Sequence, residues 1–319
     1  MQRPRFLPDN MTLLLLGVIL IASFFPARNH VAVVFDQLSV WMIALLFFMH
    51  GAKLSREAVM SGLTHWRLHL LVLAITFVAF PVLGLVLKPV LMPLLTPELY
   101  VGILFLCMLP STVQSSIAFT SVARGNVSAA VCSASASNLL GIFITPLLVS
   151  LLLKTQGEGG SSLDGMLKIV VQLLLPFVAG QLARPFLQAW ITKHAQVLKM
   201  VDQSSILLVV FVAFSEAVVQ GLWAQVPKLM LLSILLISGV MLAIIMVLTM
   251  FVSRRLGFNK EDEITIVFCG SKKSLASGVP MAKVLFSSGS VGMVLLPLML
   301  FHQLQLMVCA ILAQRYAKR

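Results

Sequence analysis

Long apolar segments, separated by short polar or charged stretches, run through the whole chain. A helix needs about 20 mostly apolar residues to cross a bilayer, so segments of this length predict membrane spans. Charges and turn residues divide the chain into ten such segments, at residues 11–26, 31–50, 68–88, 99–120, 127–153, 166–184, 203–221, 229–253, 263–286 and 290–314. We therefore predict an all-α polytopic membrane protein with ten transmembrane helices.

The first and sixth segments are the shortest. Each has 15 uncharged residues, 11–25 and 169–183, so each must be a short span or rely on flanking side chains that reach the interface. Arg3 and Arg5 precede the first segment in the manner of a secretory signal. Because many more spans follow, we interpret this segment as a retained first helix.

Composition agrees with a membrane protein and leaves no separate soluble domain. Of 319 residues, 59% are apolar and 11% are charged, with a mean hydropathy of +1.02, whereas a soluble domain has about 25% charged residues. The net charge of +12 is compatible with nucleic-acid binding, but the distribution of the charges explains it better, and we expect no nucleic-acid partner. Cys107, Cys132, Cys269 and Cys309 are scattered through apolar segments, so we interpret them as small hydrophobes.

Basic residues are shared unequally between the two sides that ten spans create. One side, which includes both termini, carries 15 basic residues and the other carries six. Cytoplasmic loops are enriched in Lys and Arg, so we place both termini in the cytoplasm and the protein in the inner (plasma) membrane. The larger set is Arg3, Arg5, Lys53, Arg56, Arg67, Arg124, Arg184, Lys193, Lys199, Arg254, Arg255, Lys260, Arg315, Lys318 and Arg319, and the smaller set is Arg28, Lys88, Lys154, Lys168, Lys228 and Lys283.

The stretch with the strongest loop character, residues 156–162, lies at the midpoint of the chain and separates five spans from five. A unit of five spans that starts inside finishes outside, so a second unit of five is inverted, as in many secondary transporters. We predict two inverted five-helix repeats, residues 1–155 and 163–319. The fourth and ninth spans, at corresponding places in the two halves, are both polar and interrupted.

These two interruptions are the candidate site. Pro110 removes a backbone donor from the fourth span, and Lys272 and Lys273 lie inside the ninth, where charges mark a binding site or a translocation path. Matching Ser115-Ser-Ile-Ala with Lys273-Ser-Leu-Ala would put both breaks at the same depth. Two broken helices that cross near the midplane can hold a cation on carbonyl and hydroxyl oxygens, or an anion on amide ends and ammonium groups. The candidate residues are Ser111, Thr112, Gln114, Ser115 and Ser116 in the fourth span and Gly270, Ser271, Lys272, Lys273 and Ser274 in the ninth.

Two plainer interpretations stay open. The proline and serines could only kink and pack helices, as small residues often do in membranes, and the lysine-containing stretch could be a loop. Further polar residues are open in the same way. Ser133, Ser137 and Asn138 mark one side of the fifth span, and His302 and Gln305 interrupt the tenth; each group either lines the site or joins helices by hydrogen bonds. Glu216 lies near the outer interface and is the acidic candidate for pairing with a lysine.

Five stretches give the chain a family resemblance: PSTVQSS at 110–116, ARGN at 123–126, GIFITPL at 141–147, LPFVAG at 175–180 and FCGSKKSLA at 268–276. The chain resembles the bile acid:sodium symporter superfamily, most closely the branch of the seventh vertebrate member of solute carrier family ten and its bacterial relatives. The resemblance implies a panel of spans 1, 2, 6 and 7, a core of spans 3–5 and 8–10, and a crossing of spans 4 and 9. It also implies coupling of sodium entry to uptake of an organic anion.

The family's sodium ligands are carried over only in part. The family's Ser-Asn pair corresponds to Ser115 and Ser116, where sodium binding stays open, and a glutamine of the third span corresponds to Thr76. The shared sodium-binding carboxylate is replaced by Phe268, and two amides are replaced by Lys272 and Lys273. A hard cation without a carboxylate and beside two ammonium groups is disfavoured. We expect no cofactor and no metal site, with Na⁺ or H⁺ as the coupling ion.

Three roles remain for the lysines. One ammonium could stand at the former sodium position as a tethered cation, one lysine could load and release a proton, or both could bind an anionic solute. We expect a secondary active transporter (symporter-like) of a small organic anion, working by alternating access in the lipid bilayer. The alternative is a membrane regulator of cation (calcium) homeostasis with little transport of its own. No HExxH motif, paired intramembrane aspartates or Walker loop supports an enzyme or a pump, and the oligomeric state stays open.

Overall fold

The computed structural model of the chain describes residues 10–53, 65–153, 170–286 and 290–318, and all of its described elements are helices. The first half contains α1 (Asn10–Phe24), α2 (Asn29–Lys53), α4 (Trp66–Ala74), the π-helix η2 (Ile75–Ala79), α5 (Phe80–Val86), α6 (Lys88–Leu91), α7 (Pro97–Met108), α8 (Gln114–Val122) and α9 (Val127–Leu152). The second contains the π-helix η3 (Val170–Leu174), α11 (Leu175–Lys193), α12 (Ala195–Val219), α13 (Leu222–Gln225), α14 (Lys228–Arg255), α15 (Lys260–Gly270), α16 (Leu275–Leu285) and α17 (Val291–Ala317).

Each apolar segment found in the sequence overlaps one or more helices within the described residues. Six stretches of the described chain are long and apolar enough to cross a membrane: 29–53, 66–86, 127–152, 195–219, 228–255 and 291–317. The segments at 99–120 and 263–286 fail this length criterion because each is split into two short helices, α7 with α8 and α15 with α16. The protein is therefore an all-helical, multi-pass membrane protein.

The predicted boundary between the two halves, at 156–162, and the first residues of the predicted span 166–184 lie outside the described residues. The division into repeats at 155 and 163 therefore stays a prediction.

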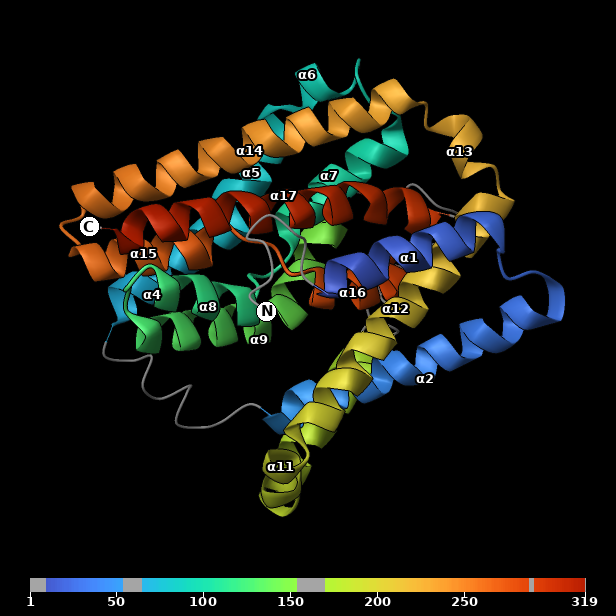
Figure 1. The fold of residues 1–319 in the computed structure, drawn as a ribbon, viewed down its shortest axis with the longest axis horizontal. Coiled ribbons are helices and arrows are strands. Elements are labelled where there is room, and N and C mark those ends of the chain that lie inside the picture. The colour runs from blue at the N-terminus through green and yellow to red at the C-terminus, as the bar shows by residue number, and fades with distance from the viewer. Residues whose placement is uncertain (1–9, 54–64, 154–169, 287–289, 319) are drawn as a thin grey trace.

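The helices form two groups (Figure 1). In the first, called the side layer here, α2 packs along α11 and α12, and α1 packs along α12. The second, called the main bundle, contains the helices from α4 to α9 and from α14 to α17. Gly51 of α2 and Gly180 of α11 face the partner helix's backbone, and a Cβ at either position would overlap a backbone oxygen, that of Phe177 or Phe48. Small residues thus allow these two helices to cross in direct backbone contact.

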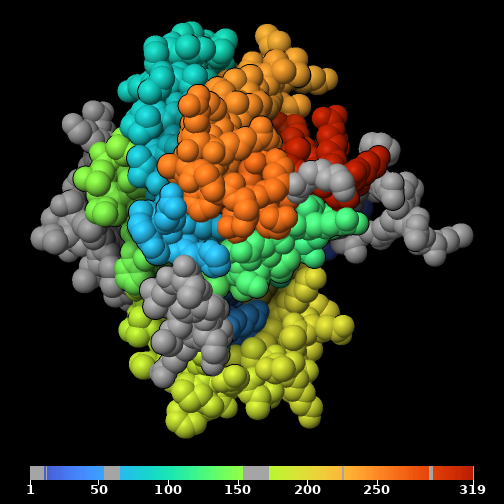
Figure 2. Space-filling model, turned by 90° about the vertical axis from the view of Figure 1, so that its left-hand side faces the viewer, coloured from blue at the N-terminus to red at the C-terminus, as the bar shows by residue number. Residues whose placement is uncertain are grey.

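The molecule has two different ends along its long axis. The turn between α14 and α15, with Arg254, Arg255 and Lys260, and the last residues of α17 lie at one end, called the basic end here (Figure 1). The short helix α13 lies at the opposite end, called the α13 end (Figure 1). Figure 2 looks onto the basic end and shows a hollow between α8, in green, and the yellow residues of α11 and α12.

The main bundle has its densest packing around α7, α15 and the first half of α17. Every residue of α15 from Asp262 to Gly270 is buried, and so is nearly all of α7. A helix surrounded by protein has no face on which a polar group can reach lipid or bulk water, so each polar group that it carries needs a partner inside. This requirement determines how the two helix breaks are built.

Candidate functional site

The two breaks lie side by side in the main bundle. One separates α7 from α8 at residues 109–113, and the other separates α15 from α16 at residues 271–274. The amide of Ser274 donates to the carbonyl of Pro110 at 2.8 Å, and the Ser274 hydroxyl caps α16 by accepting from Ser277 N at 3.1 Å. A helix that ends inside the protein leaves its last carbonyl groups without intrahelical donors. Groups from other segments must therefore satisfy those carbonyls.

The carbonyls at the end of α15 are taken by hydroxyls from the other break. Ser111 Oγ donates to Cys269 O at 2.5 Å, and Ser116 Oγ donates to Phe268 O at 3.0 Å. Both serines are fully buried. These two bonds hold the end of α15 against the start of α8, so the two serines have a defined structural task whether or not they also meet a solute.

The carbonyls at the end of α7 are taken by an ammonium group. Lys273 Nζ lies 2.7 Å from Cys107 O and 2.8 Å from Leu109 O, at the negative end of that helix. In an unbroken helix Cys107 O would accept from the amide of Ser111. That amide instead donates to Ser137 Oγ at 3.0 Å, which leaves Cys107 O open for the lysine.

The third acceptor of Lys273 is the carbonyl of Thr76, at 2.7 Å. Thr76 lies in the π-helix η2, in which the amide of Phe80 bonds to Ile75 O, five residues earlier. The same pattern would pair Thr76 O with residue 81, but residue 81 is a proline and has no amide hydrogen. The sequence therefore leaves one carbonyl free at the place where the ammonium arrives.

Three carbonyl oxygens around one nitrogen require three N–H donors, and a lysine has three only as an ammonium. The three carbonyls therefore fit the ammonium form of Lys273, which is 0% exposed. Its Nζ also lies 4.1 Å from the centroid of the Phe80 ring, whose negative face favours a cation. We call Lys273 with the carbonyls of Thr76, Cys107 and Leu109 the carbonyl cage.

The backbone of Lys273 is held as firmly as its side chain. Gln305 Oε1 accepts from Lys273 N at 2.9 Å, and Gln305 Nε2 donates to Lys273 O at 3.0 Å. The same amide nitrogen lies 2.9 Å from Nδ1 of His302. The buried Gln305 therefore satisfies both backbone groups of a residue that belongs to no helix, and the polar interruption of the tenth segment has a hydrogen-bonding role.

Lys272 lies in a different environment. Its Nζ is also fully buried, but it lies over the face of Phe119, 4.0 Å from the ring centroid, and 5.5 Å from that of Phe268. It has no hydrogen-bond partner among the described residues. We call Lys272 with Phe119 and Phe268 the aromatic pocket. Two adjacent lysines of the sequence thus have opposite surroundings.

The fifth segment contributes unequally. Asn138 Nδ2 donates to Ser111 O, and Asn138 Oδ1 accepts from Ser277 Oγ at 2.7 Å. With Ser137, it connects α9 to both breaks. Ser133, one turn earlier, does not reach the breaks, because its hydroxyl lies 2.6 Å from Nδ1 of the buried His69 on α4.

The remaining candidates of the fourth and ninth segments fall into three groups. Thr112 Oγ1 lies 2.7 Å from Ser115 Oγ and 3.1 Å from Ser116 Oγ, so three hydroxyls form a short chain. Ser271 Oγ donates to Val267 O of its own helix at 2.6 Å, next to the buried Gly270. Gln114 is exposed at the first position of α8, away from this buried network.

One sequence-based expectation is wrong. The match of Ser115 with Lys273 does not align the two breaks, because Ser115 lies in the first turn of α8 whereas Lys273 lies before α16 begins at Leu275. Aligning the helix starts pairs Lys273 with Thr112 instead. A serine followed by small apolar residues suits both a cap and a first helical turn, so such a match does not determine the register.

Three participants were not found from the sequence. Thr145 is a buried polar partner of the site, because its Oγ1 donates to Met108 O at 2.8 Å, and His69 is the buried partner that holds Ser133 away from the breaks. The third is Lys283, which faces Asp36 and Glu216 near the α13 end. Thr145 stands directly before Pro146 inside α9, and a hydroxyl beside a helix-interior proline could have been noticed. A backbone acceptor such as Thr76 O cannot be recognised from the type of its side chain. The only related sign in the sequence is Pro81, which lacks the amide hydrogen that would bond to this carbonyl.

Comparison with known proteins places this chain in a family. The family model described as the SBF-like CPA transporter family matches residues 9–318. The Pseudomonas aeruginosa protein PA2026 is 65% identical over 319 residues, which is 100% of this chain and 96% of the relative. The Escherichia coli protein named "Putative symporter YfeH" is 58% identical over 314 residues, 98% of this chain and 93% of the relative. Rat sodium/bile acid cotransporter 7 is 29% identical over 278 residues, 85% of this chain and 80% of the relative.

The resemblance to the bile acid:sodium symporter superfamily, and to this branch of it, is thereby confirmed. The family is one of transporters and not of enzymes. Since the match extends over nearly all of its length, this multi-pass membrane chain belongs to the SBF-like CPA transporter family.

Proposed function

We propose that the protein is a secondary active transporter of a small organic anion, and that Lys273 replaces a coupling sodium ion. The observation that carries this proposal is the carbonyl cage, in which one buried ammonium binds three carbonyls from two separate segments. Backbone carbonyls at a helix break are ligands that a transporter offers to a coupling cation. Here a covalently attached cation occupies them, and it cannot cross the membrane.

The chemistry around the cage supports this replacement. By the family resemblance, Phe268 corresponds to the family's sodium-binding carboxylate. The hydroxyls of Thr112, Ser115 and Ser116 are neutral oxygens, and the neighbouring helix break carries two buried lysines. A hard cation prefers anionic oxygens. Transport that does not depend on sodium follows, with sodium at Ser115 and Ser116 disfavoured and the proton left as the coupling ion.

Lys272 supplies the attraction for an anion. Its ammonium has three donors and no hydrogen-bond partner in the described part of the chain, and it lies over the ring of Phe119 on α8. A carboxylate, sulfate or phosphate would satisfy these donors. A solute that approaches through the hollow would pass α8, whose first residue, Gln114, is exposed.

The arrangement of helices fits alternating access. The side layer corresponds to the panel, spans 1, 2, 6 and 7, and the main bundle to the core, spans 3–5 and 8–10, of two inverted repeats. The excess of Lys and Arg supports a cytoplasmic location of the basic end and of both termini, in the inner (plasma) membrane. Relatives named as a symporter and as a sodium/bile acid cotransporter support the same class of function.

Uptake into liposomes tests the proposal. The purified protein is reconstituted, and uptake of labelled organic anions is measured with a sodium gradient, with a proton gradient, and with neither. We expect saturable uptake that does not depend on sodium and is lost in Lys272→Met and Lys273→Met. Lys228→Met is the matched control, because Lys228 is exposed at the first residue of α14.

Two outcomes would contradict the proposal. Strict dependence on sodium would show that the ammonium does not replace the ion. Absence of flux for every anion and gradient, together with altered calcium handling in cells that lack the protein, would support the alternative of a regulator of cation homeostasis.

A further inference from the structure

The side layer and the main bundle are in close contact near the α13 end. Among the side-layer helices, α12 carries the main contact with the bundle, through α16 and α17. Gly292, in the first turn of α17, faces Ala213 and Ala217 of α12 so closely that a Cβ at position 292 would overlap the Ala217 side chain. No solute can pass between the two groups of helices at this point.

An ion-pair cluster crosses the same boundary. Lys283, near the end of α16 in the main bundle, has a side chain only 7% exposed. Its Nζ lies 2.7 Å from Asp36 Oδ1 on α2 and 3.9 Å from Glu216 Oε2 on α12. Both carboxylates belong to the side layer, so a buried cation of one group is shared between anions of the other.

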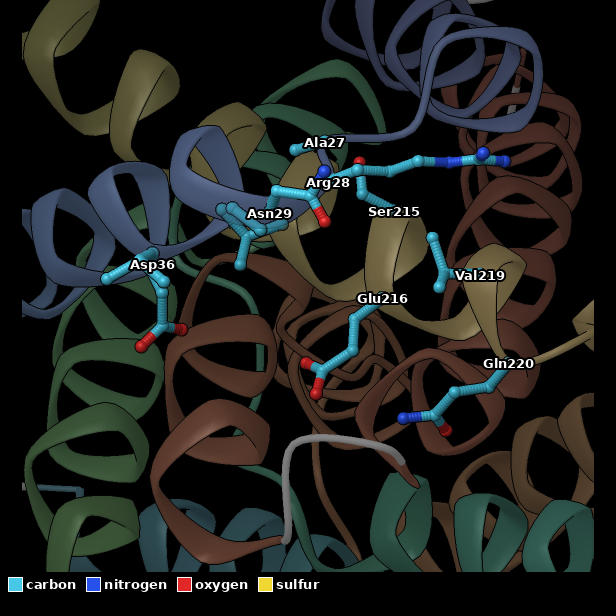
Figure 3. Close-up of a pocket in the computed structure, with 11 residues that line it drawn as sticks. Ala27, Arg28, Asn29, Asp36, Ser215, Glu216, Val219 and Gln220 are labelled. Atoms are coloured by element: carbon cyan, nitrogen blue, oxygen red, sulfur yellow. The ribbon is translucent and has the colours of Figure 1, made fainter.

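The carboxylates face a pocket of about 600 Å³ between α2 and α12 near the α13 end (Figure 3). Arg28, Asp36 and Glu216 are its charged lining residues, and Figure 3 shows the two carboxylates on the same side of the pocket, with Arg28 extending away from them. Ser215 also lines it; this residue is 2% exposed, and its hydroxyl has no partner among the described residues. The two carboxylates of the ion-pair cluster therefore line this pocket, while Lys283 reaches them from the main bundle.

The opposite end differs. At the basic end Figure 2 shows the hollow beside α8, and α8 packs against α9, α15 and α17 of its own group. Among the described residues of that end, Lys53 and Asp202, 2.5 Å apart, join α2 to α12 within the side layer. Arg254 and Lys260 pair with Glu263 at 3.0 and 2.6 Å within the main bundle. None of these three ion pairs crosses between the two groups of helices.

We infer that Lys283, Asp36 and Glu216 form a gate that closes the α13 end and keeps the basic end open. This inference rests on the proposed alternating access, because these ion pairs must break when the side layer tilts against the main bundle. Breaking it separates a mostly buried ammonium from its carboxylates. In the state with the α13 end open, water or solute must therefore reach Lys283.

Thiol accessibility in lipid nanodiscs, where both faces are open to reagent, tests the gate without any substrate. Ser215→Cys reports on the α13 end, since it is nearly isosteric and buried, and Ala118→Cys reports on α8, where Ala118 is exposed. The four native cysteines are buried, and mass spectrometry distinguishes them from the reporters. Labelling rates with a charged maleimide are compared before and after Lys283→Gln.

We expect Lys283→Gln to raise the labelling rate of Ser215→Cys about three- to tenfold and to lower that of Ala118→Cys, with Lys228→Gln changing neither. The double exchange Lys283→Asp with Asp36→Lys should restore both rates. A variant that merely unfolds would be labelled faster at both reporters.

Unchanged rates in Lys283→Gln, or no restoration by the exchanged pair, would overturn the gate. If saturable uptake exists while these rates stay constant, the proposed transport stands and this gate does not. If the rates change reciprocally while no anion is taken up, the gate stands and the proposed transport does not.

Discussion

The carbonyl cage and the aromatic pocket hold neighbouring residues of one break, yet they solve the problem of a buried charge in opposite ways. Lys273 receives three carbonyl oxygens that would otherwise lack donors. Lys272 receives the faces of two aromatic rings and no hydrogen bond from the described residues. The first arrangement stabilises the lysine and the breaks together, whereas the second leaves donors unsatisfied. The contrast suggests that one ammonium holds the structure and the other is kept available for a ligand.

Among the tests of this contrast, the largest effect is expected from Lys273→Met, which keeps the length of the side chain and removes the charge. Three buried carbonyls would lose their donor, so we expect a loss of about 3–5 kcal/mol in unfolding free energy. Denaturant unfolding in detergent micelles measures it, with the exposed Lys228→Met as the control. A loss below about 1 kcal/mol would show that water or a neighbouring side chain can replace the ammonium.

Lys272→Met should have a smaller effect of the opposite sign. An unpaired charge is removed from a fully buried position and replaced by an apolar chain of similar volume, so the unfolding free energy should rise by about 1–2 kcal/mol. Anion uptake should be lost in the same variant. Unfolding free energy and anion uptake are measured on the same preparation of Lys272→Met. If this variant loses both, it behaves as Lys273→Met does, and the two lysines do not have different roles.

The smallest effect is expected from Phe119→Leu, which removes the ring that lies closest to Lys272 Nζ, at 4.0 Å from its centroid. A cation–π contact contributes about 0.5–2 kcal/mol. A double-mutant cycle with Lys272→Met isolates this contribution from the lost ring volume. A coupling energy near zero would show that the ring only fills space and that the aromatic pocket is not the reason for the lysine's position.

Several parts of the site followed from local features of the sequence. Pro110 cannot continue a hydrogen-bonded helix, and the polar stretch around Lys272 and Lys273 interrupts an apolar segment, so both breaks were expected where they occur. Pairing between the breaks was expected as well, and the bond from Ser274 N to Pro110 O is one of its forms. The different partners of Ser133 and Ser137 were not expected, because Ser133 bonds to His69 of another helix.

The sequence alone determined the apolar segments, the two interruptions and the presence of two charges inside the ninth segment, because hydrophobicity and helix breaking are properties of a residue and its near neighbours. Only the tertiary structure decided that Lys273 reaches Thr76 O and that Lys272 reaches Phe119. It also decided that Lys283 bridges two groups of helices through Asp36. The state of a buried charge is set by whatever packs on its other side, and those groups come from segments that are distant in the chain.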